Sequence, residues 1–551
     1  MGVGGAAVTS AEAAQYRAAG WWTDTTLSEC VVRNATSAPD KPAYIDFSLD
    51  SDFSLDSPDR MLTWSTFDHA ATNLGYRLLA FGVAPGDGVA VWHKDSSAIH
   101  VLLVAIERCG AVAVGLGARA GVREVTAILR TARPTLVVTD VERLAPAQQA
   151  AGHADRALRV VALGDGSADL CLDTTPRPDG TAGLSPVGPD DVFLINSTSG
   201  TTGLPKCVVH TQNRWHYFHQ KAVANGELKS DDVFLPVIPT PFGFGIWTSH
   251  TTPIHLGATA VRIERFDPVA TCAAIAHHRA TVLCCVSTQL AMILANRTSR
   301  DYDLTSLRVV FTGGEPLPYT QAAQFEELTG VTILQFYGSN ETGMLSATTL
   351  ADPLNRRLRT AGRIVPEMQV RLFDGDRDVT ESGLGQPACR GPALSLGYLG
   401  GTDHDKLFTK DGWMRMGDIC ELDADGYLTL TGRTSDFILR GGKNISAVQV
   451  EEAVATHPAI AVAAAVAMPD PLFGERVCVF VELKQASALD LPVLVEHLLQ
   501  LGVSKELLPE RLEVLDELPR SSGGKIAKGT LREQIRSTLE AGLEIRQEQR
   551  S

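Results

Sequence analysis

Two periods of apolar residues alternate along the first third of the chain. Apolar side chains recur at helical spacing over 63–82, 98–108 and 122–130, and short apolar runs typical of buried strands occupy 89–92, 111–114 and 135–139. This alternation predicts an α/β fold with layered sheets. Before it, residues 1–60 predict a loosely ordered start, one helix and one strand, with an exposed polar loop over 48–53. After it, the Pro- and Gly-rich segment 174–189 is a predicted linker.

Further apolar runs predict strands in the middle of the chain, at 191–195, 232–237, 280–286, 307–311 and 331–336. Polar, glycine-containing loops follow the last two of these strands. Because ligands in open α/β sheets bind beyond the carboxyl ends of the strands, these loops are candidate ligand-binding segments.

The last part of the chain has the pattern of a small α+β domain. Helices are predicted over 447–456 and near 491–501, and strands near 461–468 and 477–483. The charged, turn-rich segment 433–436 precedes this part. We therefore predict a large N-terminal domain of several subdomains over 1–432, a hinge over 433–436 and a small C-terminal domain over 437–551.

Composition and charge mainly exclude classes of partner and of site. Among 551 residues, 44% are hydrophobic and 21% charged, and 49 basic against 64 acidic side chains give a net charge of −15. This balance argues against nucleic acid or an anionic membrane as the main partner. The ten cysteines are scattered, without CxxC or a metal-type Cys/His spacing, which fits a reducing cytoplasm. Neither a basic, apolar leader nor an apolar run of about 18 residues occurs, so we expect no signal peptide and no membrane span.

The segment Asn196–Lys206 is the first candidate for chemistry. Gly200 and Gly203 permit close approach of a ligand, and Lys206 adds a point charge. Hydroxyl and amide donors come from Ser197, Thr198, Ser199, Thr201 and Thr202. The pattern indicates a polyphosphate-binding loop, although Leu204-Pro205 departs from the nucleotide loop GxxxxGK[ST]. A Ser/Thr/Gly-rich surface loop is the alternative that this segment alone leaves open.

Other residues suit the remaining parts of a nucleotide and an acid. Tyr337 offers an aromatic face for a base, and Glu341 could hold Mg²⁺ against phosphate oxygens. Asp418 and Arg433 would suit a ribose diol. The aromatic, glycine-rich bend over 239–247 is either a core corner or a wall of an apolar acyl or aryl pocket.

A pair of histidines and a pair of cysteines raise the question of a metal site. His277 and His278 precede Cys284 and Cys285, but their spacing is not that of a known ligand set. We therefore interpret 280–286 as a core strand that contains two buried cysteines.

In their order along the chain, the polar segments resemble those of the adenylate-forming superfamily of acyl-CoA synthetases, aryl-acid ligases, luciferases and peptide-synthetase adenylation domains. The segments that carry the resemblance are Ser197–Lys206, Gly313–Pro316, Tyr337–Glu341, Gly417-Asp418, Gly432-Arg433, Gly441–Ser446 and Pro519–Lys525. Tyr16–Trp22 and Pro509–Lys528 look most like the aryl and alicyclic carboxylate–CoA ligase branch. The resemblance implies that a carboxylate and MgATP form an acyl-adenylate with release of pyrophosphate. The acyl group then passes to a thiol after the small, mobile domain rotates.

The resemblance also implies roles for individual residues. The implied catalytic residues are Lys525, Glu341 and Lys206, with Glu341 as the Mg²⁺ ligand. The ATP phosphates would be bound by Ser197, Thr198, Ser199, Gly200, Thr201, Thr202, Gly203, Lys206 and Asn340. Adenine and ribose would be bound by Gly313, Gly314, Glu315, Tyr337, Gly338, Asp418 and Arg433, and the acid by Thr240, Phe242, Gly243, Phe244 and Gly338. The hinge residue would be Ser435, and the thiol tunnel and CoA site would involve Gly441, Gly442, Lys443, Phe473 and Arg476.

Several positions depart from the family pattern. Cys207 stands where the phosphate loop usually has another glycine, and Asn340 replaces the usual threonine before Glu341, so we expect an altered nucleotide geometry. Ser435 takes a hinge position where aspartate or lysine is common, and a serine still permits rotation.

The pocket segment departs as well. Pro239, Thr240 and Phe242 replace the His-Asn-aromatic segment of salicylate-type ligases. We therefore expect a pocket for an apolar aryl or alicyclic ring that does not read an ortho-hydroxyl in the way those ligases do.

The leading prediction is an ATP-dependent, AMP-forming ligase that adenylates a small aryl or alicyclic acid and passes the acyl group to CoA, with ATP and Mg²⁺ as cofactors. One alternative changes the acceptor to a carrier-protein thiol or an amine. Another, kept open by the pocket segment and Cys207, is activation of nitrite for diazotisation of an arylamine. A nucleotide-binding regulator without catalysis is a third, and the presence of Glu341 and Lys525 counts against it. The sequence leaves open the acid, the acceptor and the oligomeric state, a homodimer being one alternative.

Overall fold

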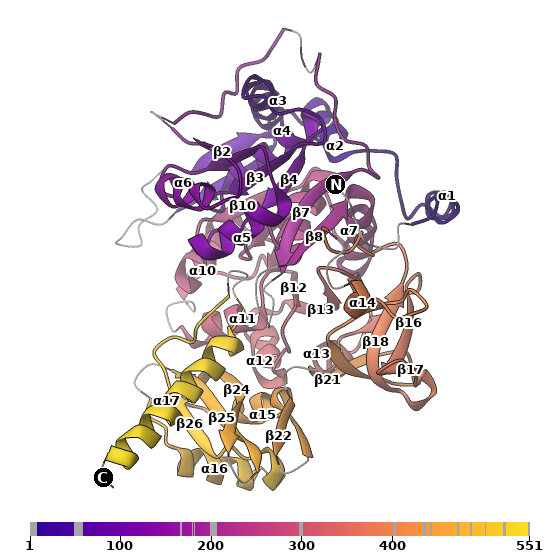
Figure 1. The fold of residues 1–551 in the computed structure, drawn as a ribbon. Coiled ribbons are helices and arrows are strands. Elements are labelled where there is room, and N and C mark those ends of the chain that lie inside the picture. The colour runs from indigo at the N-terminus through magenta and orange to yellow at the C-terminus, as the bar shows by residue number, and fades with distance from the viewer. Residues whose placement is uncertain are drawn as a thin grey trace.

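A computed structural model of the chain describes residues 8–48, 59–165, 168–178, 180, 182–198, 206–296, 301–400, 404–433, 437–440, 443–470, 473–484, 487–501, 503–521 and 525–548. The fold is mixed α/β, with a large N-terminal domain of layered sheets and a smaller C-terminal domain below it in Figure 1. This confirms the predicted fold class. Among the described helices, none combines the length and the apolar composition that crossing a membrane requires.

The first sheet of the large domain has the strand order β6-β5-β3-β4-β7-β8. Its strands are β3 (Gly88–Trp92), β4 (Val112–Gly115), β5 (Leu136–Thr139), β6 (Arg159–Ala162), β7 (Val192–Thr198) and β8 (Lys206–Thr211). The neighbouring pairs are parallel except that β8 runs antiparallel to β7. On one face Val89 and Val91 share a core with α3 (Trp64–Ala80) and α4 (Ser97–Arg108). On the other face Ala90 and Trp92 pack with α5 (Val122–Ala132) and α6 (Leu144–Gly152), so β3 is buried on both sides.

The second sheet has the order β15-β14-β13-β12-β11-β9-β10-β1-β2. Its strands are β1 (Pro42–Phe47), β2 (Arg60–Thr63), β9 (Val233–Pro236), β10 (Thr259–Ile263), β11 (Val282–Cys284), β12 (Val309–Gly313), β13 (Thr332–Ser339), β14 (Gly343–Ala347) and β15 (Arg363–Ile364). The run from β13 to β1 is parallel, and β2, β14 and β15 are antiparallel. One face shares the first core with the first sheet. The other face is covered by α10 (Pro268–His278), α11 (Ser287–Ala295) and α12 (Tyr319–Thr329).

Helices that connect or flank these sheets complete the layers. They are α1 (Ser10–Ala18), α2 (Leu27–Ser37), α7 (Gln212–Gly226), α8 (Gly243–Ile246), α9 (Thr252–Leu256) and α13 (Leu354–Arg359). A π-helical turn, Trp247–Thr251, joins α8 to α9, so the aromatic bend predicted over 239–247 opens directly into a continuous helical stretch. Such π turns are frequent at functional sites.

A third sheet closes the large domain on the right of Figure 1. Its strands are β16 (Gln369–Asp374), β17 (Arg377–Asp378), β18 (Leu384–Arg390), β19 (Met414–Arg415), β20 (Asp418–Leu422) and β21 (Leu428–Arg433), with α14 (His404–Leu407) and the 3₁₀ turn Thr380–Ser382 beside them. The pairing of β20 with β21 sets Asp418 opposite Arg433.

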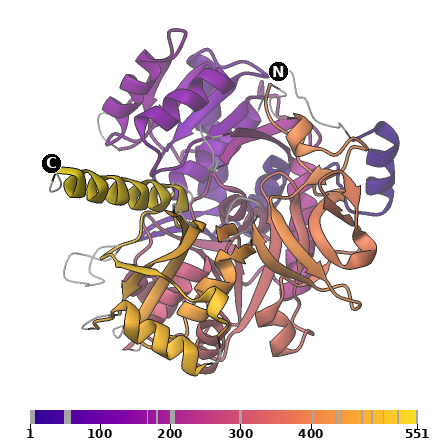
Figure 2. The same ribbon diagram turned by 60° about the horizontal axis from the view of Figure 1, so that its bottom comes forward.

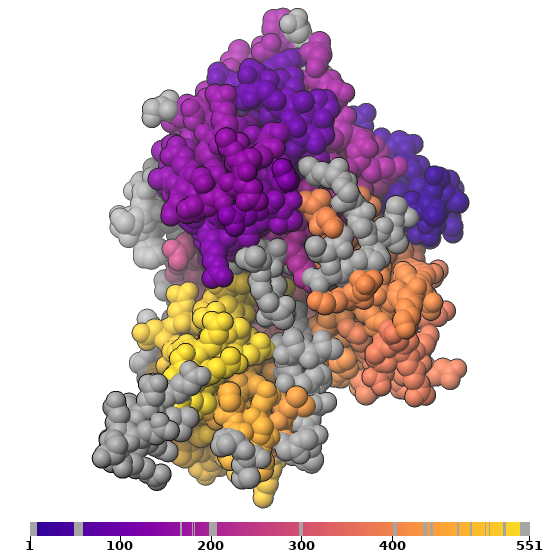
Figure 3. Space-filling view, in the orientation of Figure 1, coloured from indigo at the N-terminus to yellow at the C-terminus, as the bar shows by residue number. Residues whose placement is uncertain are grey.

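The small domain is built on an antiparallel sheet with one parallel edge strand. Its strands are β22 (Phe437–Arg440), β23 (Lys443–Ser446), β24 (Ile460–Asp470), β25 (Gly474–Leu483) and β26 (Arg511–Val514). Its helices are α15 (Ala447–Val454), α16 (Leu491–Gln500), α17 (Lys528–Glu548) and a 3₁₀ turn at Lys505–Leu507. Figure 3 shows the small domain, in yellow, packed below the large domain. In Figure 2 the helix α17 extends away from the rest of the molecule. The predicted hinge residues 434–436, including Ser435, lie outside the described residues, so the domain boundary stays a prediction.

Most predicted elements are confirmed, and the differences fall near the site. The strand predicted over 331–336 extends to Ser339, because antiparallel pairing with β14 supplies partners for its last residues. The strand predicted over 307–311 is shifted to Val309–Gly313. Tyr337 and Gly313 therefore lie in strands, where the sequence predicted loops. The strand β8 and the helix α1 were not predicted.

Candidate active site

The predicted phosphate loop connects β7 to β8, two antiparallel strands. At the end where the loop joins the two strands, Thr198 pairs with Lys206, and Ser197 pairs with Cys207. Ser199, Gly200, Thr201, Thr202 and Gly203 lie outside the described residues, so their roles stay predictions. The chain passes through all of β8 before α7 begins at Gln212. A helix therefore does not follow the loop directly, in agreement with the departure of its sequence from GxxxxGK[ST].

Lys206 and Glu341 meet at Tyr398, which the sequence analysis missed. Nζ of Lys206 lies 4.8 Å from the centroid of the Tyr398 ring, and the Tyr398 hydroxyl donates to Oε1 of Glu341 at 2.8 Å. Tyr398 is held there because the neighbouring Leu399 N–H donates to the carbonyl of Cys207 at 2.8 Å, which attaches this segment to β8. The single aromatic residue in a glycine-containing string over 395–400 was the available sequence signal.

Cys207 faces away from the ligand side of β8. Its side chain is buried in the core that contains Ile195, Val209 and Leu399. Burial in these apolar surroundings raises the pKa of the Cys207 thiol to about 12. The departure from glycine at this position therefore serves the packing of α5 against the first sheet, and the thiol stays protonated.

The predicted adenine and ribose residues lie together. The hydroxyl of Tyr337 donates to Oδ2 of Asp418 at 2.8 Å, and both side chains are buried. Gly338 follows Tyr337 in β13, and a Cβ there would stand 1.7 Å from the carbonyl oxygen of Gly343, so no larger residue fits. Arg433 lies opposite Asp418 in the strand pairing. Strands of the second and third sheets thus meet at this point.

Glu315 makes different contacts from those expected of an adenine-binding residue. Its Oε2 accepts from the Ser287 hydroxyl at 3.0 Å and from the Thr288 N–H at 3.3 Å, with a further hydrogen bond from the Thr288 hydroxyl. The carboxylate thus holds the beginning of α11 against the turn after β12. Anions are favoured at a helix N-terminus, which explains this arrangement.

Lys525 reaches the large domain at Gly314. Nζ and Cε of Lys525 lie 3.0 and 3.1 Å from the position that a Cβ on Gly314 would take, and Gly314 has a φ of +80°. The N–H of Ser521 donates to the carbonyl of Lys525 at 2.7 Å, which closes the turn that presents the lysine. The small domain therefore places its candidate catalytic cation at the carboxyl end of β12, beside Gly313.

Aromatic rings pack together at the residues that were predicted to bind the acid. The rings of Phe244 and Phe336 are 4.6 Å apart, and Trp247 lies 5.5 Å from Phe336 and 5.3 Å from Phe311. Phe242, Gly243 and Phe244 are half-buried at the beginning of α8. Aromatic and small residues at this place suit a flat, apolar ring.

Thr240 lies behind this wall in a buried polar group. Its N–H donates to Oδ1 of Asp95 at 3.0 Å, and its hydroxyl accepts from Nη2 of Arg262 at 3.2 Å. Arg262 also pairs with Asp95 at 3.2 Å. The described contacts of Thr240 therefore position the backbone of the bend.

A second buried group supports the loop that carries Glu341. Arg214, in α7, is 1% exposed, and it donates to the carbonyl of Asn340 and to that of Ala393, each at 2.6 Å. It also donates to Nδ1 of His210. Burial lowers the pKa of Arg214 to about 9, with the nearby carboxylate of Glu341 opposing the shift. The sequence analysis missed both Arg214 and His210, because neither belongs to a recognised segment.

The predicted thiol-side residues lie on the small domain. Gly441 and Gly442 are outside the described residues, and Lys443 begins β23. Phe473 is 40% exposed, with the Arg476 guanidinium 4.9 Å from its ring centroid. Nε of Arg476 also donates to Oδ2 of Asp470 at 2.6 Å, so part of its charge is already compensated.

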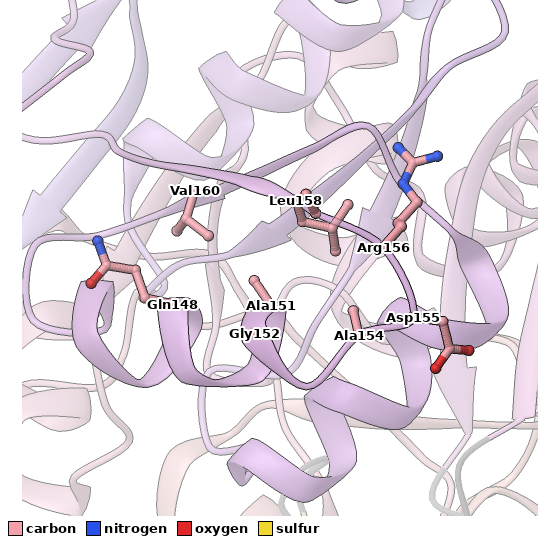
Figure 4. Close-up of a pocket in the computed structure, with 9 residues that line it drawn as sticks. Gln148, Ala151, Gly152, Ala154, Asp155, Arg156, Leu158 and Val160 are labelled. Carbon is pink, nitrogen blue, oxygen red and sulfur yellow. The ribbon is translucent and has the colours of Figure 1, made fainter.

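Two other features lie apart from this site. Cys284 and Cys285 are fully buried, Cys284 at the end of β11, which confirms the core-strand interpretation, while His278 lies 2.9 Å from Asp59. A surface hollow beside α6, shown in Figure 4, contains none of the predicted site residues. It is lined by Gln148, Ala151, Gly152, Ala154, Asp155, Arg156, Ala157, Leu158 and Val160.

Comparison with known proteins identifies the family of this chain. The family model described as AMP-binding enzyme matches residues 31–399, and that of the AMP-binding enzyme C-terminal domain matches residues 449–525. The medium-chain fatty-acid–CoA ligase of Escherichia coli (strain K12) is 31% identical, over 96% of this chain and 93% of that protein. The indoleacetate–CoA ligase of Aromatoleum aromaticum (strain DSM 19018 / LMG 30748 / EbN1) is 30% identical, over 92% of this chain and 98% of that protein.

A solved structure shares the fold. The anthranilate CoA ligase AuaEII, in complex with anthranoyl-AMP, superimposes with a TM-score of 0.83 at 24% sequence identity, covering 94% of this chain and 98% of that one. The two matched ranges include Lys206, Glu341 and Lys525, whereas Asp418 and Arg433 lie between them. The chain is an ATP-dependent, AMP-forming ligase and belongs to the AMP-binding enzyme family.

Proposed function

We propose that this enzyme adenylates a small aryl or alicyclic carboxylic acid and transfers the acyl group to CoA. The observation that carries the proposal is the position of Lys525, whose Nζ lies 3.0 Å from the Cβ position of Gly314. Gly313, which precedes Gly314, pairs with Phe336 next to Tyr337, and the hydrogen-bonded pair of Tyr337 and Asp418 suits a nucleoside. The aromatic wall at Phe244 offers a place for the acid.

In the first half-reaction an oxygen of the acid attacks the α-phosphorus of ATP, and the bond to the β-phosphate oxygen breaks as pyrophosphate leaves. This step brings anions together, so a cation that contacts both reactants stabilises the transition state. Lys525 fills that role, and Lys206 holds the departing phosphates. Glu341, with Oε1 oriented by Tyr398, is suited to hold Mg²⁺. When bound, Mg²⁺ neutralises part of the phosphate charge.

The ring cluster and two relatives support an aryl acid. The ring centroids of Phe244, Trp247 and Phe336 lie 4.6 to 5.7 Å apart, so the three rings pack against one another as an apolar, aromatic wall. The indoleacetate–CoA ligase and the anthranilate CoA ligase are named for acids that carry aromatic rings. An acid of that class therefore has priority in a substrate panel.

A carrier-protein thiol is a second candidate for the acceptor of the acyl group. The observation that favours it is the charge balance at the predicted CoA site, where Arg476 is paired with Asp470 and Nη1 of Arg440 lies 3.2 Å from Glu510. CoA carries phosphate groups that need unpaired cations, whereas the thiol arm of a carrier protein does not carry the 3′-phosphate. Amine acceptors and nitrite are also included among the compounds to be tested. The sequence leaves both open, nitrite because of the unusual pocket segment at Pro239, Thr240 and Phe242.

Pyrophosphate exchange over a panel of acids tests the first half-reaction, with nitrite included. Mass spectrometry of the products with CoA, with a phosphopantetheinylated carrier protein and with an arylamine tests the second. We expect exchange with aryl acids and a CoA thioester. Exchange without any thioester would overturn the CoA assignment, and lack of exchange with every acid would overturn the adenylation proposal.

A further inference from the structure

The side-chain amide of Asn340 lies between the loop of Glu341 and the acid pocket. Its Nδ2 donates to Oδ1 of Asn196 at 2.5 Å. Its Oδ1 is buried and has no hydrogen-bond partner among the described residues. The position that a Cβ on Gly243 would take is 2.9 Å from this oxygen and 3.5 Å from Cη2 of Trp215. Asn340 Oδ1 therefore faces the side of Gly243 that has no side chain.

A chain of buried hydrogen bonds fixes which way this amide points. Arg214 has only donors, so Nδ1 of His210 must accept from it, and the ring proton must lie on Nε2. Nε2 of His210 then donates to Oδ1 of Asn196 at 2.7 Å, while Nδ2 of Asn196 donates to the carbonyl of Pro241 at 3.0 Å. Both assignments follow from the partners. Burial lowers the pKa of His210 well below its usual value, which keeps this ring neutral.

The orientation of the Asn196 amide determines the orientation of the Asn340 amide. Because Oδ1 of Asn196 can only accept, Asn340 must turn its NH₂ group toward it, and its carbonyl oxygen must point to Gly243. One N–H of the Asn340 amide is taken by Asn196, and its carbonyl oxygen, which can only accept, cannot bind a phosphate oxygen. A buried acceptor without a partner is unfavourable, and none of the residues that the structure describes donates a hydrogen bond to this oxygen.

We propose that the acid activated by this enzyme carries an N–H or O–H donor on its ring and that this donor hydrogen-bonds to Oδ1 of Asn340 above Gly243. Asn340 and Gly243 are then specificity-determining residues for an amino- or hydroxyl-substituted aryl acid. The proposal rests on the proposed function, since it identifies the substrate class of the same site. A site with a buried acceptor rejects an analogue that lacks the donor more strongly than an apolar pocket rejects a change of one methyl group.

Pyrophosphate exchange with matched acids tests the proposal. Each of 2-, 3- and 4-aminobenzoate is compared with the methylbenzoate of the same substitution, which has a similar shape but no donor, and the hydroxybenzoates form a second series. We expect at least one donor-bearing isomer to exceed its methyl counterpart in kcat/KM by about 10- to 100-fold. Exchange with the acids but without any such preference overturns the proposal alone. Lack of exchange with every acid overturns the proposed function as well.

Two variants test whether Asn340 and Gly243 cause the preference for acids with a hydrogen-bond donor. Asn340→Leu removes the acceptor at similar volume, and Gly243→Ala places a methyl group 2.9 Å from Oδ1 and blocks the donor. In both, the ratio of kcat/KM between donor-bearing and methyl acids should fall to within about threefold, and a general loss of stability would not change this ratio. Gly121→Ala, at a glycine with no neighbouring atom within 4 Å of its Cβ position, is the matched control. If Asn340→Leu instead raises the KM for ATP and keeps the ratio, the side chain binds phosphate and the proposal is wrong.

Discussion

The two walls of the active site are held in different ways. On the large domain, Arg214 supports the Glu341 loop through buried hydrogen bonds of 2.6 Å. On the small domain, Lys525 belongs to a turn whose described contacts with the large domain include a 3.7 Å approach of Arg520 to Met292. Another contact is a 3.3 Å hydrogen bond from Gln321 to the carbonyl of Ala461. The first wall is part of a core, whereas the second lies at an interface between two domains, where the Ser446 hydroxyl also donates to the carbonyl of Thr431 at 2.5 Å.

This difference matches the needs of a ligase with two half-reactions. Under the proposed function, the groups that hold the nucleotide and the acid keep their geometry through both steps, whereas Lys525 must be able to leave before the thiol arrives. Interfaces between domains of one chain commonly permit relative motion of the domains. The predictions below change one wall at a time.

Lys525→Ala should have the largest effect. Removing one charge that stabilises the transition state costs about 10²- to 10³-fold in rate, so pyrophosphate exchange should fall by that amount. Thioester formation from a supplied acyl-adenylate should continue, because the lysine serves the first half-reaction. Lys528→Ala is the control, since Lys528 lies in the same segment but pairs with Glu451 at 2.7 Å. Full exchange activity in Lys525→Ala would remove this lysine from the mechanism.

Arg214→Met should weaken the fixed wall itself. The substitution leaves the carbonyls of Asn340 and Ala393 buried without their donor, and each such group costs about 1–3 kcal/mol. We expect the free energy of unfolding to fall by about 2–4 kcal/mol and the adenylation rate to fall with it. Denaturant unfolding and pyrophosphate exchange measure the two effects.

Arg356→Met provides a matched control for Arg214→Met. Arg356 is also paired, at 2.5 Å with Asp423 and at 2.8 Å with Asp425, but these side chains are partly or mostly exposed, so its removal should lower the free energy of unfolding much less than Arg214→Met does. Equal losses in the two variants would contradict the distinction between a buried support and a surface ion pair.

The two walls also differ in how far the sequence predicts them. The helix over 64–80 and the strand over 88–92 follow from apolar periodicity, which is a local property, and the structure confirms both. Lys525 and Glu341 were identified because they stand in recognisable segments. Arg214 and Tyr398 were not, because each acquires its role from a residue 126 or 57 positions away. A contact at that separation leaves no periodic signal in one sequence.

Acid should destabilise the large domain first. Burial lowers the pKa of His216 to about 4 and those of His219 and His250 to about 3, from an ordinary value of 6.5. These rings are neutral when folded and take up protons when unfolded, so their stabilising contribution is complete above pH 6.5 and is lost as the pH falls toward 3. A fully buried histidine such as His250 should contribute about 2 kcal/mol less at pH 5 than at pH 7.5.

Hydrogen exchange measured at pH 7.5 and pH 5 separates the domains. We expect peptides of α7 and α9 to lose protection at pH 5, while peptides of β24 and β25 keep more of theirs. In the small domain, the rings of His457 and His497 lie 4.8 Å apart, and Thr456 contacts His497 in an exposed setting. His219→Phe, which replaces a ring stacked 4.7 Å from His255, should lower the pH at which α7 opens. Earlier loss of protection in β24 than in α7 would reverse this assignment.

Tyr398→Phe should have the smallest effect. It separates the role of the Tyr398 hydroxyl, which contacts Glu341, from that of the ring, which contacts Lys206. The substitution removes the hydroxyl that donates to Glu341 at 2.8 Å but keeps the ring 4.8 Å from Nζ of Lys206. A hydrogen bond to a charged group contributes about 1.5–3 kcal/mol, so the rate of adenylation at limiting Mg²⁺ should fall roughly tenfold. Tyr398→Leu also removes the ring and with it a cation–π contact of about 0.5–1 kcal/mol. If orienting Glu341 is the main role, added Mg²⁺ should recover much of the rate in Tyr398→Phe and less in Tyr398→Leu. Equal recovery in both would mean that Lys206 is positioned by something other than this ring.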